Sequence, residues 1–296
     1  MNVTPLSEAQ QRPRRVAVGE FDGVHLGHQE VIRDADTVLT FDPHPLAVIN
    51  PTAAPKLLGD IDLRAELIGE LGVEEVVVIP FDAEFAQRSA QDFVDRVLVG
   101  VLGATHVAVG RNFRFGHKAA GDAALLAADD RFETRIVELV EVEEETVSSS
   151  HVRGLVAAGE VEHAISFLGR PFPLRGEVVH GDGRGSELGY PTANVVPDER
   201  LIRPDEGVYA CLANGLPAAI NIGVRPMFET GRGVLIEAYL IDFEGDLYGT
   251  ELKVEFLKRL RGEKLFATVE ALVEQIDRDV AQARDVCRAF ATVPRP

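Results

Sequence analysis

The chain has 296 residues, 46% of them hydrophobic and 26% charged, an ordinary globular composition with enough length for two domains. Its formal net charge of −18 argues against duplex nucleic acid or an anionic membrane as a partner, and small anionic substrates would need local positive groups and a divalent cation. The two cysteines, Cys211 and Cys287, form no C-x-x-C pattern and indicate neither a disulfide framework nor a zinc site. Residues 1–13 have no apolar leader segment and no apolar run reaches membrane-spanning length, so we expect a cytoplasmic, reduced protein.

The first motif in chain order is GEFDGVHLGH, residues 19–28, which follows the short apolar run 16–18. A β-branched run, a glycine-containing turn and then helix-forming residues predict a strand that feeds a helix, with backbone N–H groups converging on a phosphate site. His25 and His28 stand three residues apart, project from one side of the helix start and have ring N–H groups suited to triphosphate oxygens. Two histidines that merely cap a helix are the alternative, but the preceding Phe-Asp-Gly at a strand end favours a nucleotide site.

The rest of the first half alternates short β-branched runs with helical patterns, which is typical of a parallel sheet with crossover helices. Strands are expected at 16–18, 37–41, 76–81, 107–109 and 135–142, and helices around 63–71, 90–102 and 123–128. Ser89 followed three residues later by Asp92 resembles a capping box for the second of these helices. Only residues 29–36 remain for the first crossover helix, which is barely two turns.

Three further segments carry polar groups at strand ends or a helix start, and ligands in open α/β sheets bind beyond strand ends. TFDPHP, residues 40–45, has two prolines that direct the chain as it leaves its strand, so it is either a rigid exit turn or part of a binding site. GRNFRFG, residues 110–116, is dense in hydrogen-bonding groups, although its phenylalanines could equally tuck into the core. In SSSHVR, residues 148–153, hydroxyl groups precede Arg153, which suits a phosphate as well as an ordinary helix cap.

The pattern changes in the second half. Residues 161–169, followed by Arg-Pro-Phe-Pro, are predicted to form a linker, because paired prolines terminate a helix. Short strands without intervening helices then predict a small antiparallel barrel, and an amphipathic helix from about 269 to 290 should close the chain. These strands are expected at 174–180, 208–213, 218–223, 234–241 and 252–256. We therefore place a boundary near residue 170, between domains 14–169 and 170–292.

The chemistry of the second half concentrates in GDGRGSELGYPTAN, residues 181–194. Its glycines alone would indicate only a flexible loop, and no G-K-[ST] follows to make a Walker A motif. Thr192 and Asn194, however, stand two apart in an extended segment that follows Pro191, so their oxygens are expected on the same side. Two neutral hard oxygens beside a glycine-rich loop can ligate Mg²⁺ that nucleotide phosphates also hold.

Glu237 lies within an otherwise apolar strand pattern, residues 234–241, and is therefore expected to be partly buried. Burial makes a carboxylate a better proton acceptor, as a general base for a hydroxyl nucleophile requires. The alternative is a glutamate at a barrel rim that pairs with an arginine.

These motifs together closely resemble the bifunctional prokaryotic riboflavin kinase/FAD synthetase family, whose nucleotidyltransferase signature is G-x-F-D-G-V-H-x-G-H. The likeness extends over T-F-D-P-H-P, G-x-[DN]-F-R-F-G and an S-S-T-x-I-R-like segment in which Ser150 replaces Thr. In the second half it includes P-T-A-N, the strand of Glu237 and LRGEKLF, residues 260–266. The resemblance implies a Rossmann-like nucleotidyltransferase domain with a parallel sheet, followed by a riboflavin kinase-like antiparallel barrel with a closing helix.

The resemblance also implies roles for particular residues of this sequence. ATP would be bound by Gly19, Phe21, Asp22, Gly23, His25, His28, Ser149, Ser150 and Arg153 in the first domain, and by Gly181, Gly183, Gly185, Thr192 and Asn194 in the second. Flavin would be bound by Asp42, Pro43, His44, Asn112, Arg261 and Glu263. Thr192 and Asn194 would hold Mg²⁺, Glu237 would deprotonate the ribityl 5′-hydroxyl, and His25 and His28 would act in adenylyl transfer.

The implied activities are ATP-dependent phosphorylation of riboflavin to FMN in the second domain and adenylylation of FMN to FAD, with release of pyrophosphate, in the first. ATP and Mg²⁺ would serve both, the expected partners are small molecules, and the sequence does not indicate an oligomeric state. Two alternatives remain: a riboflavin kinase whose first domain, shortened at residues 29–36, has lost adenylyl transfer, and a flavin-binding protein without turnover. A protein that only binds flavin needs neither a metal site nor a base, so Thr192, Asn194 and Glu237 argue against the second.

Overall fold

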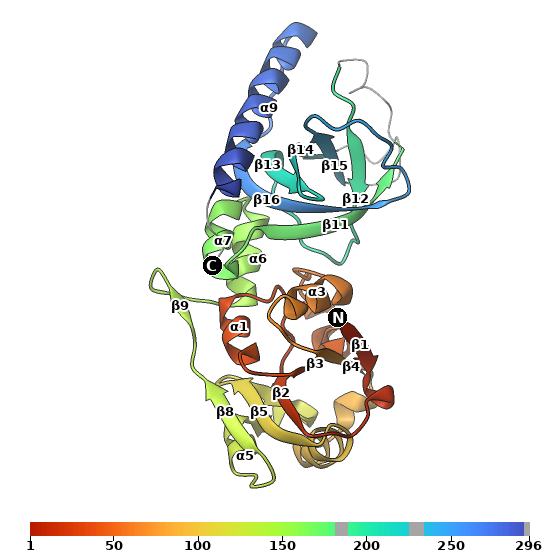
Figure 1. The fold of residues 1–296 in the computed structure, drawn as a ribbon, viewed down its shortest axis with the longest axis vertical. Coiled ribbons are helices and arrows are strands. Elements are labelled where there is room, and N and C mark those ends of the chain that lie inside the picture. Colours follow the sequence, from red (N-terminus) through yellow and green to blue (C-terminus); the bar gives the residue numbers. More distant parts are fainter. Residues whose placement is uncertain (181–188, 225–233, 293–296) are drawn as a thin grey trace. The chain divides into compact units, whose positions relative to one another are not determined.

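The computed structural model describes residues 1–180, 189–224 and 234–292 (Figure 1). By its internal contacts the chain divides into two compact units, Met1–Ser149 and Ser150–Pro296. The first is built around a parallel sheet and the second around a closed barrel, as the sequence predicts. None of the helices in these described ranges is long and apolar enough to cross a membrane.

The first unit contains a six-stranded sheet in the order β1–β4–β3–β2–β5–β8, whose paired strands are all parallel. Its strands are β1 (Asn2–Pro5), β2 (Arg14–Val18), β3 (Thr37–Asp42), β4 (Glu75–Pro80), β5 (Ala104–Gly110) and β8 (Glu133–Val137). The edge strand β1 was not expected, because its four residues carry no apolar run. The strand expected over 135–142 is interrupted: β8 ends at Val137, and the short β9 (Glu141–Val142) pairs with β10 (Glu145–Thr146).

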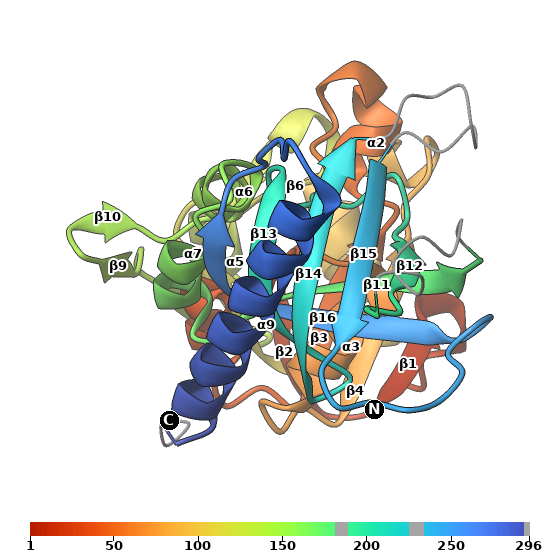
Figure 2. The same cartoon turned by 90° about the horizontal axis from the view of Figure 1, so that it is seen from above.

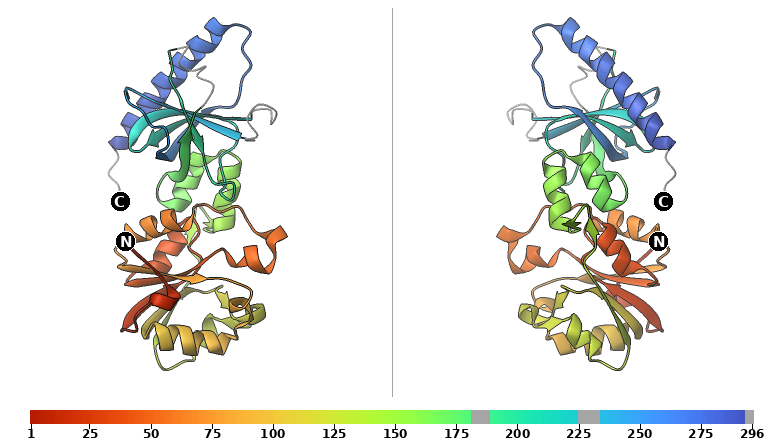
Figure 3. Two further views of the ribbon diagram at one scale, coloured as in Figure 1. Left: turned by 90° about the vertical axis from the view of Figure 1, so that its right-hand side faces the viewer. Right: turned by 90° about the vertical axis from the view of Figure 1, so that its left-hand side faces the viewer.

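Helices lie on both faces of this sheet (Figure 3), and alternate residues of β2 enter the two cores between them. Val16 and Val18 belong to one core, whereas Ala17 belongs to the other. Ser89 Oγ accepts a hydrogen bond from the Asp92 backbone N–H at 3.0 Å, which confirms the predicted helix cap. The helices are α1 (Leu26–Ile32), α2 (Pro45–Ile49), α3 (Ile61–Gly69), α4 (Ala90–Asp92), the wider π-type helix η4 (Phe93–Val101) and α5 (Ala123–Ala127).

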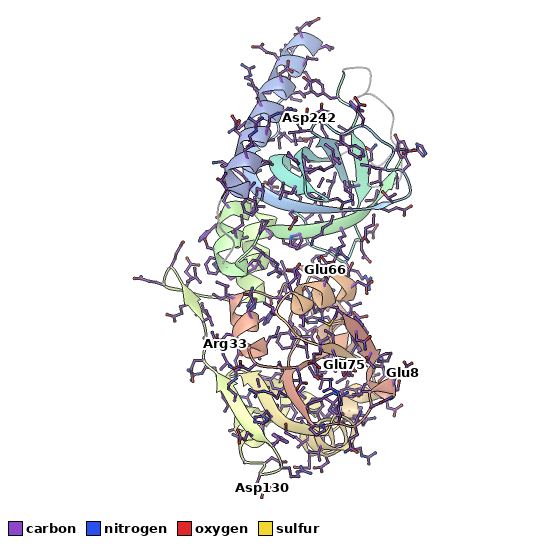
Figure 4. The ribbon with its side chains drawn as sticks, viewed as in Figure 1. Glu8, Arg33, Glu66, Glu75, Asp130 and Asp242 are labelled. Atoms are coloured by element: carbon purple, nitrogen blue, oxygen red, sulfur yellow. The ribbon has the colours of Figure 1, made fainter. Side chains whose placement is uncertain are left out.

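A buried ion pair links β2 and β4 at the edge of the sheet where the strands begin, opposite the edge that carries the predicted motifs. Arg14 on β2 is almost completely buried, and its Nη2 donates to Glu75 Oε2 on β4 at 2.9 Å. Glu75 is labelled in Figure 4. Arg14 Nη1 also donates to the Leu102 carbonyl at 3.0 Å. These bonds replace part of the hydration that the buried guanidinium loses.

The second unit begins with two helices, α6 (Ser149–Ala157) and α7 (Val161–Leu168). The predicted linker over 161–169 is therefore wrong: most of it is α7, which contacts strands of the barrel. The helix buries its apolar side chains at 161, 164, 167 and 168, a helical spacing that the following prolines obscured. It ends at Gly169, whose left-handed backbone (φ 73°) suits glycine. By contacts this helix pair groups with the barrel, whereas the sequence pattern places the boundary near residue 170.

Six antiparallel strands form the barrel in the order β11–β12–β15–β14–β13–β16. They are β11 (Phe172–Val179), β12 (Ala193–Val196), β13 (Gly207–Ala213), β14 (Leu216–Val224), β15 (Val234–Leu240) and β16 (Glu251–Arg261). All five expected strands are present, and β12, which contains Asn194, completes the closed barrel.

The closing helix α9 (Val269–Ala291) matches the predicted range and lies across the outside of β13 and β14 (Figure 2). Ala283 of α9 packs with Ala210 and Ala219 on those strands. Cys287 on the same helix is a buried free thiol whose Sγ donates to the Cys211 carbonyl at 3.2 Å. The two cysteines, far apart in sequence, thus meet at the seam between helix and barrel.

Candidate functional site

Three of the predicted binding segments leave neighbouring strands at one edge of the parallel sheet. Strands β3, β2 and β5 are adjacent, and because they are parallel their carboxyl ends share an edge. Each strand leads into one segment: β2 is followed by 19–28, β3 ends within 40–45, and β5 ends at the first residue of 110–116. The chain runs from β2 through β3 to β4 on one side and returns to β5 on the other side of β2. Such a reversal of strand order opens a crevice for ligands beyond the strand ends.

His25 and His28 stack in this edge, with ring centroids 3.5 Å apart and ring planes inclined by 18°. His25 is the N-cap of α1, because its Nδ1 accepts a hydrogen bond from the His28 backbone N–H at 3.2 Å. Since Nδ1 accepts, the proton of the neutral His25 ring is on Nε2, which is then a donor. The structure therefore contains the helix cap that was the alternative interpretation, and it also brings the two rings together. Their contact with a triphosphate stays a prediction.

The loop that leads to these histidines has a left-handed backbone at two residues that are not glycine, Phe21 (φ 52°) and Val24 (φ 40°). Such conformations are costly, above all for a β-branched side chain, and they cluster at functional sites. Gly23 (φ 80°) is required between them, because a Cβ there would lie 2.6 Å from Leu58 Cδ1. Asp22 holds the loop in place: its Oδ1 accepts a hydrogen bond from the Leu58 backbone N–H at 2.9 Å.

Several residues predicted to bind ATP support this loop from within. The ring of Phe21 is buried, lies 3.1 Å from the position of a Cβ on Gly19 and meets the His28 ring edge-on at 5.3 Å. Ser149, the last residue of the first unit, donates from Oγ to the Asp22 carbonyl at 2.9 Å and so supports the same loop. These contacts position the histidines. Direct contact with ATP stays a prediction for all five residues, Gly19, Phe21, Asp22, Gly23 and Ser149.

The segment expected to hold flavin begins at the end of β3. Asp42 is partly buried there and is joined to Pro43 by a cis peptide bond. His44 caps α2, because its Nδ1 accepts a hydrogen bond from the Leu46 backbone N–H at 3.1 Å. One ring nitrogen of His44 is thus used to shape the loop, and contact of residues 42–44 with flavin stays a prediction.

The loop after β5 has phenylalanines that pack into or against the core, and it also has exposed polar side chains. Phe115 is buried in the core and Phe113 stacks beside it with ring centroids 5.5 Å apart. Asn112, between the same strand end and these rings, is exposed. The phenylalanines therefore anchor the loop, and Asn112 is exposed on it together with Arg111 and Arg114. Contact of Asn112 with flavin stays a prediction.

The remaining predicted residues of the first site lie on α6. Ser150 and Arg153 belong to the second unit, and Arg153 Nη1 donates to Ser150 Oγ at 3.4 Å. Their role toward a nucleotide in the first unit stays a prediction. Gly181, Gly183 and Gly185, predicted for the second nucleotide site, lie outside the described residues.

In the barrel, the predicted residues Asn194 and Glu237 form a row across three strands together with Asn221. Asn194 on β12 is directly opposite Glu237 on β15, and Glu237 is directly opposite Asn221 on β14. Residues opposite each other in antiparallel strands point to the same face, with Cβ atoms about 5 Å apart. Asn221 Nδ2 donates to Glu237 Oε2 at 3.4 Å, and Glu237 is partly buried, as expected. Thr192 precedes β12 by one residue and so lies next to the row.

This row lies on the outer face of the barrel. The alternating residues Ile220, Ile222 and Ile236 are fully buried and face the interior. Tyr239, two residues beyond Glu237 and therefore on the same face, packs with α9. The candidate site consequently lies beside the helix rather than inside the barrel.

The row continues through Val208 on β13 to Arg261 at the end of β16. Arg261 is bound by Asp279 of α9, whose Oδ2 accepts from Nε at 3.0 Å and from Nη2 at 2.8 Å. The carboxylate of Glu263 lies against Gly223, where a Cβ would be 2.6 Å from Glu263 Oε1. The structure therefore brings Arg261 and Glu263 to the row, although the Arg261 guanidinium is already engaged by the helix. Their contact with flavin stays a prediction.

Asn221 is a site residue that sequence reasoning did not single out. Its neighbours Ile220 and Ile222 are buried, so an amide between them must point to the opposite face. A polar residue in the middle of an apolar strand was the available signal, the same one that identified Glu237. Only the register between β14 and β15 shows that the two side chains meet.

Comparison with known proteins agrees with both halves of this description. The FAD synthetase family matches residues 7–151 and the riboflavin kinase family matches residues 168–287. A bifunctional riboflavin kinase/FMN adenylyltransferase from Listeria monocytogenes is 37% identical over 286 residues, which cover 91% of each chain. The protein of the same name from Escherichia coli is 36% identical over 298 residues, 95% of each chain. A crystal structure named as a macrolide-efflux protein from Streptococcus pneumoniae has a TM-score of 0.86 at 30% identity and covers 96% of this chain and 99% of its own.

The fold and the two matches define a class of protein in which an FAD synthetase unit is followed, in one chain, by a riboflavin kinase unit. With relatives this similar over nearly the whole length, the assignment can be made more specific. The chain belongs to the bifunctional riboflavin kinase/FMN adenylyltransferase family.

Proposed function

We propose that this chain makes FAD from riboflavin in two ATP-dependent steps, phosphorylation in the barrel and adenylylation in the α/β unit. The observation that carries the first step is the row of Asn194, Glu237 and Asn221 on adjacent strands. It places a proton acceptor beside a neutral oxygen ligand, and a protein that only bound flavin would need neither.

In the barrel, Glu237 accepts the proton of the riboflavin 5′-hydroxyl. The hydroxyl oxygen forms a bond to the γ-phosphorus of ATP, and ADP leaves. Asn221 orients the Glu237 carboxylate through its 3.4 Å hydrogen bond. Phosphoryl transfer depends on positioning and charge neutralisation more than on covalent chemistry, which suits a site made of an amide, a carboxylate and a hydroxyl.

The same row suits Mg²⁺. Asn194 is 5% exposed, and its Oδ1 is buried without a hydrogen-bond partner among the described residues. A buried amide oxygen in this state is costly, and it is the kind of hard oxygen that Mg²⁺ prefers. We assign Asn194, together with Thr192, to holding the ion, which when bound neutralises the negative charge of the ATP phosphates.

In the α/β unit, FMN and ATP meet beyond the ends of β2, β3 and β5. A phosphate oxygen of FMN forms a bond to the α-phosphorus of ATP, the bond between the α- and β-phosphates breaks, and pyrophosphate leaves. His25 and His28 donate hydrogen bonds to the triphosphate, and Ser150 and Arg153 add to its binding. Flavin is held by residues 42–44 and Asn112. No covalent intermediate is required, because donors aimed at the developing charge are sufficient.

The test is to incubate the purified protein with riboflavin, ATP and Mg²⁺ and to separate the flavins by chromatography. FMN followed by FAD is the expected result. FMN as the sole product would support the alternative in which the shortened first unit has lost adenylyl transfer. Unchanged riboflavin would contradict the proposal. Its cytoplasmic location remains the expectation drawn from the sequence.

A further inference from the structure

Glu20, between Gly19 and Phe21 at the end of β2, has no role in the function described so far. It occupies the open position of the G-x-F-D-G-V-H-x-G-H signature. Part of the residue is exposed, but both carboxyl oxygens are buried and accept no hydrogen bond from any described residue. Such groups are rare in native proteins because losing water without a new partner is costly. An unpaired carboxyl at this edge of the sheet therefore calls for a ligand.

Arg64, a second unsatisfied group, acts on Glu20 from α3. The side chain is 1% exposed, and its Nη1 donates to Thr40 Oγ1 at 3.1 Å and to the Phe41 carbonyl at 3.2 Å. Thr40 Oγ1 in turn donates to the Glu20 carbonyl at 3.1 Å. Arg64 Nε and Nη2 are buried without a hydrogen-bond partner among the described residues. A buried cation with free donors thus lies near the unpaired carboxyl.

The protonation state of Glu20 follows from its surroundings. Burial raises the pKa of Glu20 from 4.5 to about 8, Arg64 opposes this rise, and the carboxylates of Asp22 and Asp42 add to it. Among the residues that the structure describes, these three charged groups act on Glu20: Arg64 from α3, Asp22 from the loop after β2 and Asp42 from the end of β3. At neutral pH the carboxyl is therefore mostly uncharged and carries a proton that it can donate.

Glu20 also lies between the two halves of the proposed adenylylation site. The loop that carries His25 and His28 follows Glu20 directly. Asp42, the first residue of the expected flavin segment, is close enough to act on the charge of Glu20. This is where the phosphate of FMN must approach the triphosphate. We propose that Glu20 is a substrate-binding residue of the adenylylation site, whose uncharged carboxyl donates a hydrogen bond to a phosphate oxygen of FMN or ATP beside the buried charge of Arg64. The inference rests on the proposed function of this unit.

Ionisation of Glu20 determines how substrate binding should depend on pH. Once ionised, Glu20 has no proton to donate and repels the phosphate. The second ionisation of a phosphate group has a pKa of about 6, below the range in which Glu20 ionises. Both cysteines lie in the barrel unit and do not disturb this window. Binding of the phosphate substrate should therefore weaken as the pH rises through about 8.

The experiment measures steady-state FAD formation from FMN and ATP by the whole protein between about pH 7 and about pH 9. In the unmodified protein, KM for FMN or for ATP should rise about tenfold over this range with little change in kcat, and the substrate whose KM rises is the one that Glu20 binds. Glu20→Gln keeps a donor and cannot ionise, so its KM should stay nearly constant. Glu20→Leu removes the donor and should raise KM about five- to tenfold at pH 7.

Riboflavin phosphorylation in the same samples is the internal control, because its site lies in the other unit. An alkaline rise of KM that persists in Glu20→Gln would overturn the proposal, as would an unchanged KM in a folded Glu20→Leu protein. Should Glu20→Leu not fold, the comparison of Glu20→Gln with the unmodified protein at about pH 9 decides. Protein that makes FMN but no FAD at any pH would contradict the proposed adenylylation itself, and with it the basis for this role of Glu20.

Discussion

A single carboxylate, Glu237, provides the most direct test of the barrel chemistry. Glu237→Gln preserves the size of the side chain and leaves the neighbouring Asn221 unchanged, but it removes the proton acceptor. FMN formation should therefore fall by about 10²- to 10⁴-fold, measured as the initial rate from riboflavin, ATP and Mg²⁺. Conversion of supplied FMN to FAD should continue, because that reaction is assigned to the other unit.

Glu177→Gln is the matched control, since Glu177 is an exposed glutamate on β11 of the same barrel. It should leave both activities unchanged. Loss of both activities in Glu237→Gln would contradict the assignment of the two reactions to independent sites, and full kinase activity would exclude Glu237 as the base.

The buried carboxyl of Glu20 should also affect the free energy of unfolding. The pKa of its carboxyl is about 8 in the folded protein, against an ordinary value of 4.5. The folded state thus keeps a proton that the unfolded chain loses as the pH rises through 4.5, so raising the pH from there to about 8 destabilises the fold. Glu20→Gln removes this penalty and should increase the unfolding free energy of the first unit by at least about 1 kcal/mol at pH 7.

The measurement is thermal or urea denaturation over a range of pH. The advantage of Glu20→Gln should be small near pH 4.5, grow as the pH rises and level off above about pH 8. An advantage that does not depend on pH would show that the buried carboxyl is not the cause.

Among the structural elements, α9 contributes more than a cover for the barrel. Its residue Asp279 is buried and accepts three hydrogen bonds from Arg261, so the helix fixes the strand end at which the candidate row finishes. Asp279→Ala leaves a partly buried guanidinium without its partner. We expect the barrel unit to lose about 2 kcal/mol in urea denaturation and riboflavin phosphorylation to weaken through KM.

The same helix supplies a control. Arg284 pairs with Asp242, whose side chain is 70% exposed, whereas that of Arg284 is 33% exposed. Asp242 is labelled in Figure 4. Arg284→Gln should therefore destabilise the barrel unit much less than Asp279→Ala, since water already solvates this surface pair. Equal losses in the two variants would mean that helix docking in general, and not the Asp279 contact, supports the strand end.

At the scale of the whole molecule, two units with separate cores should unfold separately. The parallel sheet has its own two cores, whereas the barrel and α9 share another. Calorimetry should show two transitions, with Glu20→Gln shifting only one and Asp279→Ala only the other. A single transition that both variants shift would show instead that the units fold cooperatively.

Much of this organisation is local and could be predicted from the sequence. The alternation of strand and helix patterns, the cap at Ser89 and the span of α9 depend on residues within a few positions of each other, and all appear as expected. Local reasoning failed where two signals competed: prolines after residue 170 concealed the helical spacing of α7. The short polar strand β1 has no pattern of its own and is held by pairing with β4.

The sequence by itself determined the two kinds of domain and the strand-end loops, and it identified Glu237 as a candidate base. Periodicity, turn residues and motif spacing are properties of neighbours in the chain. Only the tertiary structure decided which of these residues meet. The row from Asn194 to Asn221 depends on the register between strands far apart in sequence. The Glu20 carboxyl is buried, and the positive charge that acts on it comes from Arg64 on α3, far along the chain. Burial and register arise from packing between distant segments, and no local pattern records them.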